Sequence, residues 1–256
     1  MCGRFTREYT MQELGAFVEA CFPGGVASVD DRETPLEPSY NVAPTQRSPI
    51  VQGSGEGDAV AGLIGVRRWG LIPRWADDHS IGHRLINARS ETAAEKPAFR
   101  GAFASEGGRC VVPVSSFYEW ARPANGGAKR PHRVLRADGA VLWLAGLCEP
   151  PNEHAPEGTF TILTTPANVF VSRMHDRMPA VLEPEAAAEW CDPRTPKDHA
   201  RGLLRPAAEG VLDAHPVSRR VNSPRQDDAG LIEAAGDGSP EESAGDSTRG
   251  QPGLFG

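Results

Sequence analysis

Apolar residues recur at helical spacing near the beginning of the chain, directly after a polar start signal. Thr10 and Glu13 have the identity and spacing of a capping box, in which each side chain satisfies a backbone N–H of the other. The apolar positions that follow are Leu14, Phe17, Val18 and Cys21. This spacing predicts a helix of about 12 residues, which the segment Pro23-Gly24-Gly25 ends.

Apolar runs bounded by turn residues predict strands through most of the remaining chain. Strands are expected at 48–52, 59–69, 109–114, 116–120, 133–136, 141–147 and 159–165. Asp138-Gly139 between two such runs predicts a hairpin that joins 133–136 to 141–147. Helices are expected at 90–103, with a kink at Pro97, and at 184–191 and 197–204, whereas 23–39 and 150–158 have the composition of loops.

Strands joined mostly by short turns, with helices dispersed among them, favour an α+β fold around a curved, mainly antiparallel sheet. We expect one compact domain over residues 1–232, because no linker interrupts it. From 233 to 256 the sequence is rich in Gly, Ser, Pro and acids, which predicts a disordered acidic tail.

The composition is that of a globular protein, with 39% hydrophobic and 24% charged residues among 256. The sequence contains no apolar run of about 18 residues, so we expect no membrane span. The N-terminus lacks the apolar core of a signal peptide, which predicts a cytoplasmic protein. The five cysteines are widely spaced and odd in number, without a Cys-x-x-Cys pair, so we expect neither a disulfide framework nor a zinc site.

The net charge of −7 is unevenly distributed along the chain. Residues 226–256 hold seven acids and one base, which leaves a net charge of −1 on the rest. A nearly neutral body can still carry a local basic groove, and the charge of the groove governs phosphate binding. Nucleic acid therefore remains a possible partner.

The first four residues, Met1-Cys2-Gly3-Arg4, carry the most distinctive chemistry. Removal of Met1 would leave Cys2 with a free α-amine and a thiol on adjacent carbons. An α-amine titrates near pH ~8, so part of it is an uncharged nucleophile at neutral pH. It can form a Schiff base with an aldehyde, and the thiol then closes on the imine carbon to give a thiazolidine. Arg4 can hold a phosphate nearby. The alternative is that Cys2 is a small apolar residue at a frayed end.

Two further segments place single polar groups next to apolar residues. Asn87 can hold an amine or a sugar hydroxyl through its amide, and Arg89 offers a planar fork for phosphate; the alternative is the start of a helix at Ser90. Glu119 lies among aromatic residues, where desolvation would raise its pKa towards the range of a general acid. Its alternative is a carboxylate that faces solvent from an ordinary strand.

Histidine and tryptophan provide the remaining candidates. His175 can move protons at neutral pH, and the adjacent Asp176 and Arg177 can form an ion pair that fixes their loop; a purely structural histidine is the alternative. Trp69 and Trp75 each follow an arginine, which is the composition of a platform for single-stranded nucleic acid. Core tryptophans beside arginines that extend to solvent would give the same pattern.

Together these segments form an ordered set of motifs over about residues 2–228 that resembles the SOS response-associated peptidase (SRAP) family. The motifs are Met-Cys-Gly-Arg-Phe at 1–5, Tyr-Asn-Val-Ala-Pro at 40–44, Trp-Gly-Leu-Ile-Pro at 69–73, Asn-Ala-Arg-Ser-Glu at 87–91, Phe-Tyr-Glu-Trp at 117–120, His-Asp-Arg-Met-Pro at 175–179 and Val-Ser-Arg-Arg-Val-Asn at 217–222.

This resemblance implies an abasic-site sensor in single-stranded DNA, an enzyme that forms a thiazolidine DNA–protein crosslink through Cys2. It implies a compact α+β domain with a β-barrel-like core and a basic channel. It assigns proton transfer to Glu119, polarisation of the site and crosslink reversal to His175, and support of the nucleophile to Asn87. The DNA-contact residues that it implies are Arg4, Asn41, Pro44, Trp69, Trp75, Arg89 and Arg219. Neither the chemistry nor the sequence calls for a metal or an organic cofactor.

Two rival functions stay open, namely a cysteine peptidase that cuts other proteins and a non-catalytic module that binds single-stranded DNA. We expect a monomer associated with the nucleoid and replication fork. The tail ends in Gln251-Pro252-Gly253-Leu254-Phe255-Gly256. Gln251, Leu254 and Phe255 resemble a peptide that binds a sliding clamp, although so short a motif also arises by chance.

Overall fold

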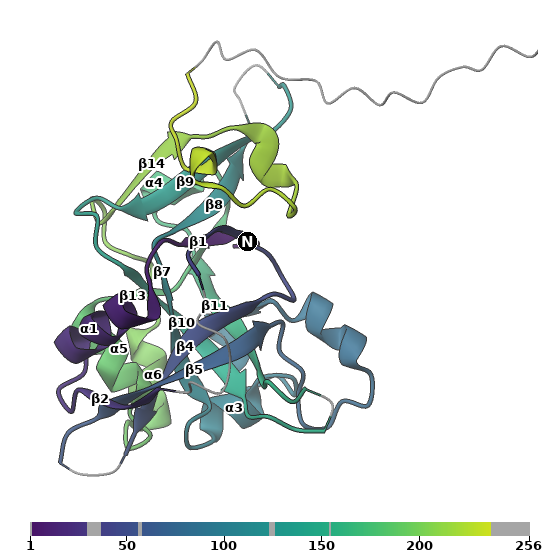
Figure 1. Ribbon diagram of the computed structural model, residues 1–256. Coiled ribbons are helices and arrows are strands. Elements are labelled where there is room, and N and C mark those ends of the chain that lie inside the picture. The colour runs from purple at the N-terminus through teal and green to yellow at the C-terminus, as the bar shows by residue number, and fades with distance from the viewer. Residues whose placement is uncertain (1, 30–36, 56–57, 123–125, 154, 237–256) are drawn as a thin grey trace, which may run out of the picture.

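The computed structural model describes residues 2–29, 37–55, 58–122, 126–153 and 155–236. Within these ranges the strands form two sheets, one above the other in Figure 1. In order across the upper sheet, the strands are β14 (Leu212–Pro216), β9 (Arg130–Arg136), β8 (Ser116–Ala121), β1 (Phe5–Arg7) and β3 (Ser39–Val42). All of its pairings are antiparallel.

The lower sheet is longer and curls back on itself. Its main path contains β12 (Arg177–Pro179), β11 (Thr159–Pro166), β10 (Leu142–Glu149), β7 (Arg109–Val114), β4 (Arg47–Ser54), β5 (Ala61–Trp69) and β2 (Val26–Val29). Two short strands join it, β13 (Val181–Leu182) beside β10 and β6 (Asn87–Arg89) beside β11. Because β11 pairs with both β10 and β5, the strands β5, β4, β7, β10 and β11 close into a ring.

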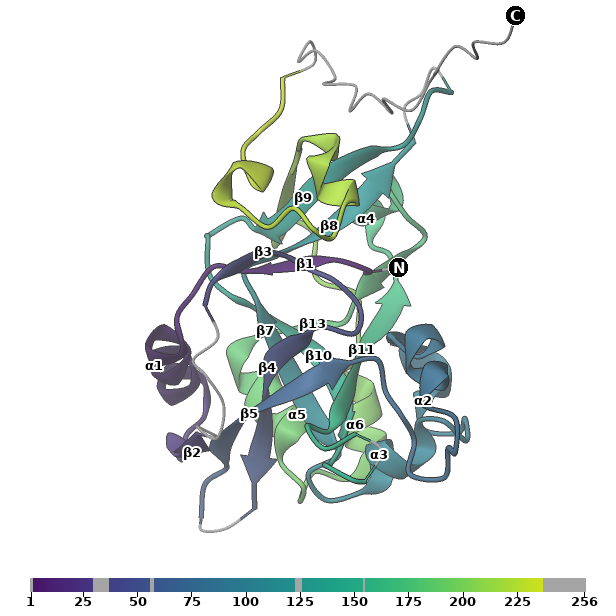
Figure 2. The same ribbon diagram turned by 45° about the vertical axis from the view of Figure 1, so that its right-hand side comes forward.

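The helices are short and lie around the lower sheet and at the ends of the upper one (Figure 2). The α-helices are α1 (Met11–Cys21), α2 (Ser90–Ala93), α3 (Arg100–Ala104), α4 (Val169–Ser172), α5 (Pro184–Cys191) and α6 (Lys197–Leu203). The 3₁₀-helices are η1 (His79–Arg84), η2 (Arg219–Asn222) and η3 (Ala229–Leu231). This arrangement confirms the mixed α+β fold around a curled, mainly antiparallel core.

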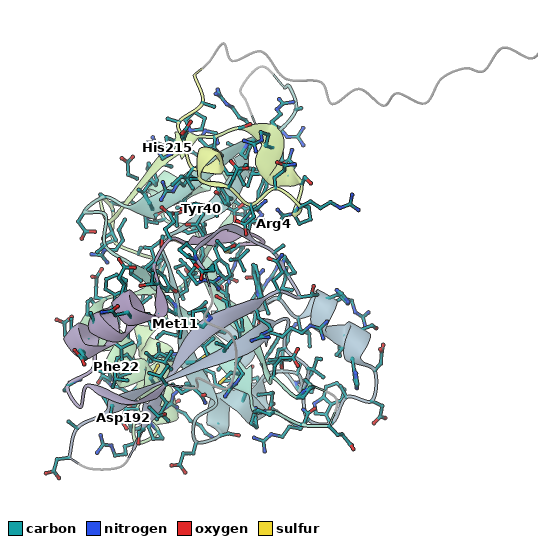
Figure 3. The ribbon with its side chains drawn as sticks, viewed as in Figure 1. Arg4, Met11, Phe22, Tyr40, Asp192 and His215 are labelled. Carbon is teal, nitrogen blue, oxygen red and sulfur yellow. The ribbon has the colours of Figure 1, made fainter. Side chains whose placement is uncertain are left out.

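Apolar side chains from both sheets fill the space between them. Phe5, Phe117 and Val134 of the upper sheet pack in one cluster with Val112 and Ile162 of the lower sheet. A second cluster lies between the lower sheet and helices α1, α3, α5 and α6. In Figure 3, Met11 and Phe22 lie on and just after α1, beside the lower sheet, whereas Arg4 and Tyr40 lie on the upper sheet.

Several predicted elements are confirmed. Thr10 and Glu13 form the capping box of α1, with Thr10 Oγ1 accepting from the Glu13 N–H and Glu13 Oε2 accepting from the Thr10 N–H. Helices α5 and α6 begin where the sequence predicts them. The predicted strands at 48–52 and 59–69 correspond to β4 and β5.

The predicted hairpin is wrong. The turn at Asp138-Gly139 forms, with Gly139 at a positive φ of 76° and its N–H bonded to Arg136 O. However, β9 pairs with β8 and β14, whereas β10 pairs with β7, β11 and β13. The turn therefore carries the chain from the upper sheet to the lower one, where the wholly buried β10 completes the ring.

Two other expectations need correction. The segment 90–103 contains two separate helices, α2 and α3, rather than one kinked helix. The expected loop at 23–39 contains strand β2. Most of the predicted acidic tail, with Gln251, Leu254 and Phe255, lies outside the described residues. None of the helices in the described ranges is long and apolar enough to span a membrane.

Candidate functional site

Cys2 is fully buried at the start of the chain, in the apolar cluster between the two sheets. Its carbonyl oxygen accepts a hydrogen bond of 2.8 Å from Asn87 Nδ2. Its thiol lies 3.8 Å from Arg4 O. Burial raises the pKa of the Cys2 thiol well above its ordinary value, and the negative charge of Glu119 raises it further.

Strand pairing explains why Glu119 lies near Cys2. Phe5 of β1 is opposite Phe117 of β8, and the Tyr118 N–H donates to Arg4 O. Because β1 and β8 are antiparallel, the residues before Phe5 lie beside the residues after Phe117. Cys2 therefore comes close to Glu119. Phe117 and Glu119 are two residues apart on a strand, so both face the apolar cluster. Glu119 is only 2% exposed.

Asn87 comes from the lower sheet. It begins β6, which pairs in parallel with β11 so that Asn87 is opposite Ile162, a member of the cluster around Cys2. Asn87 Nδ2 is engaged by the Cys2 carbonyl. Asn87 Oδ1 is buried and has no hydrogen-bond partner among the described residues. The amide therefore offers one further acceptor beside the N-terminal residue.

His175 lies in the connection between α4 and β12. Its Nδ1 accepts a hydrogen bond of 3.0 Å from the Arg177 N–H and lies 2.8 Å from an oxygen of Asp176. About a quarter of the side chain is exposed (26%). The expected pairing of Asp176 with Arg177 is wrong, because the guanidinium of Arg177 binds Glu91 instead.

The ion pair between Arg177 and Glu91 joins two of the predicted motifs across β11. Both terminal nitrogens of the Arg177 guanidinium donate to Glu91, Nη2 at 2.9 Å. Hydrogen bonding from Arg177 lowers the pKa of Glu91 from 4.5 to about 2. The segments that contain Asn87 and His175 are therefore tied together at one edge of the ring. The sequence does not predict this pair, because 86 residues separate its partners.

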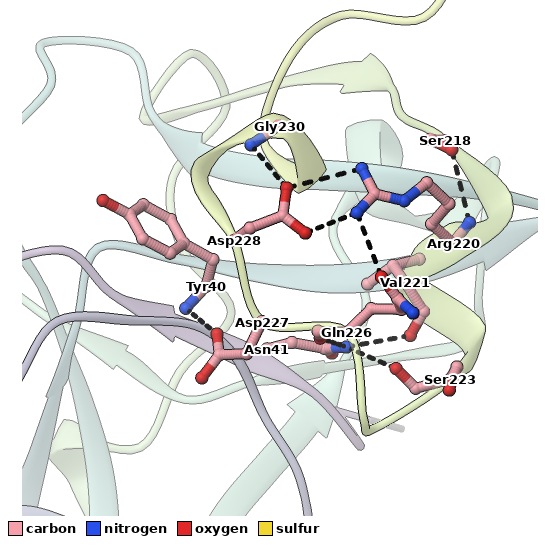
Figure 4. Close-up of polar contacts among 10 residues, drawn as sticks. All are labelled: Tyr40, Asn41, Ser218, Arg220, Val221, Ser223, Gln226, Asp227, Asp228 and Gly230. Carbon is pink, nitrogen blue, oxygen red and sulfur yellow. Dashed lines mark hydrogen bonds and ion pairs between the residues drawn. The ribbon is translucent and has the colours of Figure 1, made fainter.

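A C-terminal strap, defined here as residues 217–232, packs on the upper sheet and contacts Tyr40 and Asn41 (Figure 4). The strap also contacts Arg4. Asn41 is the centre of this contact. Its Oδ1 accepts from Arg4 Nη1 at 2.8 Å. Its Nδ2 donates to the carbonyl oxygens of Ser223 and Gln226, at 3.0 and 2.8 Å, and lies 3.3 Å from that of Val221.

Further strap contacts complete the arrangement. Arg4 Nη1 donates to Val221 O at 2.8 Å, so the strap contacts Arg4 directly as well as through Asn41. The carboxylate of Asp227 accepts from the backbone N–H of Tyr40 and, at 2.9 Å, from the hydroxyl of Ser39. The strap thus sets the position of a side chain only two residues from Cys2. The motif at 217–222 was predicted to contact DNA through Arg219. Its support of Arg4 was not predicted, because the strap bonds to Arg4 and Asn41 through backbone carbonyl groups.

The predicted DNA-contact residues divide into two groups. Trp75, Arg89 and Arg219 are exposed, and Pro44 and Arg4 are partly exposed, so these five can meet a ligand.

Trp69 and Asn41 are buried and are not surface contacts. The Trp69 ring stacks on Phe160 at 6.3 Å, packs on Phe5 at 5.0 Å and donates from Nε1 to Ile86 O, so no face is left for a base. The amide of Asn41 is fully engaged by Arg4 and the strap. Both residues support the site from within the protein.

All five cysteines are buried free thiols. In the part of the chain that the structure describes, no group of three or more His, Cys, Asp or Glu side chains is arranged to hold a metal ion.

Comparison with known proteins identifies the family of this chain. Residues 1–224 match the SOS response associated peptidase (SRAP) family, and the chain belongs to that family. It is 39% identical to the abasic site processing protein YoaM of Bacillus subtilis over 239 residues, which cover 91% of this chain and 98% of YoaM. It is 33% identical to the abasic site processing protein YedK of Escherichia coli, with 91% and 99% covered. The family resemblance found in the sequence is thus confirmed.

Solved structures show the same fold. A crystal structure of a protein from Bacteroides thetaiotaomicron superposes with a TM-score of 0.76 at 25% identity, over 91% of this chain and 100% of that one. A phage-related protein from Bordetella bronchiseptica superposes with a TM-score of 0.63 at 28% identity, over 84% and 94%.

Proposed function

We propose that this protein processes abasic sites in single-stranded DNA by forming a covalent thiazolidine with Cys2 once Met1 has been removed. The observation that carries the proposal is the position of Cys2. Its carbonyl accepts a hydrogen bond from Asn87, and the charge of Glu119 raises the pKa of its thiol. Relatives that match over nearly their whole length are named abasic site processing proteins, which supports DNA with abasic sites as the substrate.

The chemistry begins with the free α-amine of Cys2. The amine attacks the aldehyde carbon of the ring-opened sugar, and loss of one water gives an imine. The thiol then adds to the imine carbon, so that a carbon–sulfur bond forms and the thiol proton passes to nitrogen. No oxidant or reductant is consumed. The second step is intramolecular, which gives it a high effective concentration.

Three side chains assist these steps in our proposal. Asn87 Oδ1 accepts a hydrogen bond from the α-amine of Cys2 and so orients the lone pair of that nitrogen towards the aldehyde. Glu119 gives a proton to the departing hydroxyl and takes one from the attacking group, because it is buried beside the reacting atoms. His175, whose Nδ1 accepts from the Arg177 N–H and lies 2.8 Å from Asp176, polarises the site and assists reversal of the crosslink.

The raised pKa of the Cys2 thiol fits this order of events. A thiol that keeps its proton is a poor first nucleophile, whereas the amine can attack while the sulfur stays protonated. The thiol closes the ring afterwards, when the imine carbon lies within its reach. This order distinguishes the proposed reaction from that of an ordinary cysteine peptidase, in which a thiolate attacks first.

DNA would reach Cys2 across exposed cations and one exposed aromatic side chain. We propose that Arg89 and Arg219 bind phosphates, that Trp75 stacks on a base, and that Pro44 and the remaining N–H groups of Arg4 contact the backbone. An abasic nucleotide has no base to remove from a stack, so its entry into the site costs less than base flipping.

The experiment is an adduct assay with three single-stranded oligonucleotides of one sequence. One carries an abasic site, one carries a tetrahydrofuran analogue that lacks the aldehyde, and one is intact. We expect a heat-stable adduct with the first alone. Equal retention of all three, without an adduct, would identify a non-catalytic DNA-binding module. Cleavage of added peptides without an adduct would identify a peptidase that acts on other proteins.

A further inference from the structure

Cations lie at one end of the upper sheet, where the chain passes from β8 to β9. Ala121, the last residue of β8, is opposite Arg130, the first residue of β9. Arg122 follows this pair and Lys129 precedes it, and both of their side chains are exposed. The three cations are therefore neighbours at the end of the two strands.

The strap brings a further cation to the same end. The Val217 N–H donates to Pro131 O on β9 at 3.0 Å, and Trp120 Nε1 on β8 donates to Asn222 Oδ1 at 2.8 Å. Arg219 lies on η2 between these two contacts and is exposed. Figures 1 and 2 both show the yellow-green strap beside β8 and β9. We call the set of four cations the basic end, namely Arg122, Lys129, Arg130 and Arg219.

The acids of the strap already have other partners. Asp228 pairs with Arg220. Asp227 accepts from the hydroxyl of Ser39 and from the backbone N–H of Tyr40. Because both carboxylates are engaged by these groups, the basic end can attract a further anion.

Residues 235 and 236 are fixed directly beside the basic end. Arg130 Nη2 donates to Ala235 O at 2.8 Å and to Gly236 O at 3.0 Å. The Ala235 N–H donates to Pro216 O of β14 at 2.9 Å. These bonds fix the point from which residues 237–246 continue. This stretch, which we call the acidic segment, contains four acids and no base.

Chain length brings these acids within reach of the basic end. Glu242 is six residues beyond Gly236, and six residues extend at most about 21 Å. Lys129 directly precedes Arg130, which holds Gly236. A group tethered by so short a chain acts at an effective concentration on the order of 1 mM. Weak ion pairs are therefore sufficient for the segment to compete with a ligand.

We propose that the acidic segment binds the basic end in the absence of DNA and is displaced by DNA phosphates. This inference rests on the proposed function, because Arg219 is assigned there to a phosphate. Displacement of the segment lowers the affinity for intact strands, which bind reversibly, whereas the covalent step retains an abasic strand. The contact thus gives selectivity against undamaged DNA that the reaction at Cys2 does not supply.

A zero-length crosslinker tests the contact directly. A carbodiimide joins a carboxylate to an amine where the two groups touch, and the lysines of the chain are Lys96, Lys129 and Lys197. In the 256-residue chain without DNA, we expect mass spectrometry of the proteolysed monomer to find the acidic segment joined to Lys129. An intact single strand of about 16 nucleotides should remove this product. Absence of the product, or equal crosslinking of all three lysines, would overturn the proposal.

Binding of the same intact strand, measured by fluorescence anisotropy, tests the competition. The tail variant carries Asp237→Asn, Glu241→Gln and Glu242→Gln. The matched control removes three exposed acids around the lower sheet, with Glu19→Gln, Glu106→Gln and Asp198→Asn. At low salt the tail variant should bind about fivefold more tightly than the wild type, and the control within about twofold of it. The difference should shrink as salt is added. Equal affinities of the tail variant and the control would contradict the contact.

The abasic-site adduct assay separates this inference from the proposed function. At saturating abasic DNA, the tail variant and the wild type should form the adduct at the same rate, because the segment acts on binding alone. An adduct without the Lys129 crosslink leaves the function and removes the contact. The Lys129 crosslink and its loss on addition of DNA, without an adduct, keep the contact and remove the crosslinking function.

Discussion

Replacement of Asn41 by alanine tests whether the C-terminal strap supports the start of the chain. The mutation removes the acceptor of Arg4 Nη1 and the donor to the carbonyls of Ser223 and Gln226. Two ordinary hydrogen bonds contribute ~1 kcal/mol each, and the bond to the charged guanidinium contributes ~2 kcal/mol. We therefore expect the free energy of unfolding to fall by about 4 kcal/mol. For a domain of this size, that loss lowers Tm by roughly 8–16 °C.

Urea unfolding followed by tryptophan fluorescence measures this change, with an unchanged m value as the sign of two-state behaviour. Asn152→Ala is the control, because the Asn152 side chain accepts from the Ala155 N–H in a surface loop away from the strap, and this variant should lose less stability than Asn41→Ala. The Asn41 variant should also form the abasic-site adduct more slowly below its Tm, since Arg4 loses an anchor. A loss below about 1 kcal/mol would refute the role of the strap.

Three further outcomes follow from the site. Glu91→Gln should remove part of the pH dependence of stability. Because Arg177 lowers the Glu91 pKa to about 2, the pair stabilises the fold fully above pH ~4.5 and less as the pH falls towards 2. The free energy of unfolding in urea should therefore fall more in the wild type than in the variant over this pH range. The same dependence of the free energy of unfolding on pH in both proteins would contradict this role of the ion pair. Cys2→Ser should form an adduct that does not survive heating, because oxygen closes a less durable ring; an equally stable adduct on a denaturing gel would exclude the thiazolidine. Glu119→Gln should slow adduct formation by about 10²-fold or more in a single-turnover time course, and wild-type kinetics would remove Glu119 from proton transfer.

Local sequence signals predicted the starts of α1, α5 and α6. The capping box at Thr10 and the proline at the start of α5 fix helix starts by chemistry within one turn. The turn at Asp138-Gly139 was also identified, but a turn signal does not state which strands will pair beyond it. Strand β2 was missed because it is only four residues long, follows Pro23-Gly24-Gly25 and exposes three of its four residues.

The site was predicted through ordered motifs rather than through local patterns. In the structure, Asn87 donates to the Cys2 carbonyl and the charge of Glu119 acts on the Cys2 thiol, while the catalytic roles of both residues stay predictions. Trp69 and Trp75 illustrate the limit of composition, because both follow an arginine, yet one is fully buried and the other is 59% exposed. Only the packing of the ring against Phe5 and Phe160 separates the two, and those contacts join residues far apart in sequence.

The most direct test of the central proposal is the mass of the product formed between the purified protein and an abasic oligonucleotide without any reducing agent. We expect a species that lacks Met1 and equals the sum of protein and DNA less one water, and fragmentation should place the DNA on Cys2. A covalent product on another residue, or none from a protein that has lost Met1, would contradict the proposed reaction.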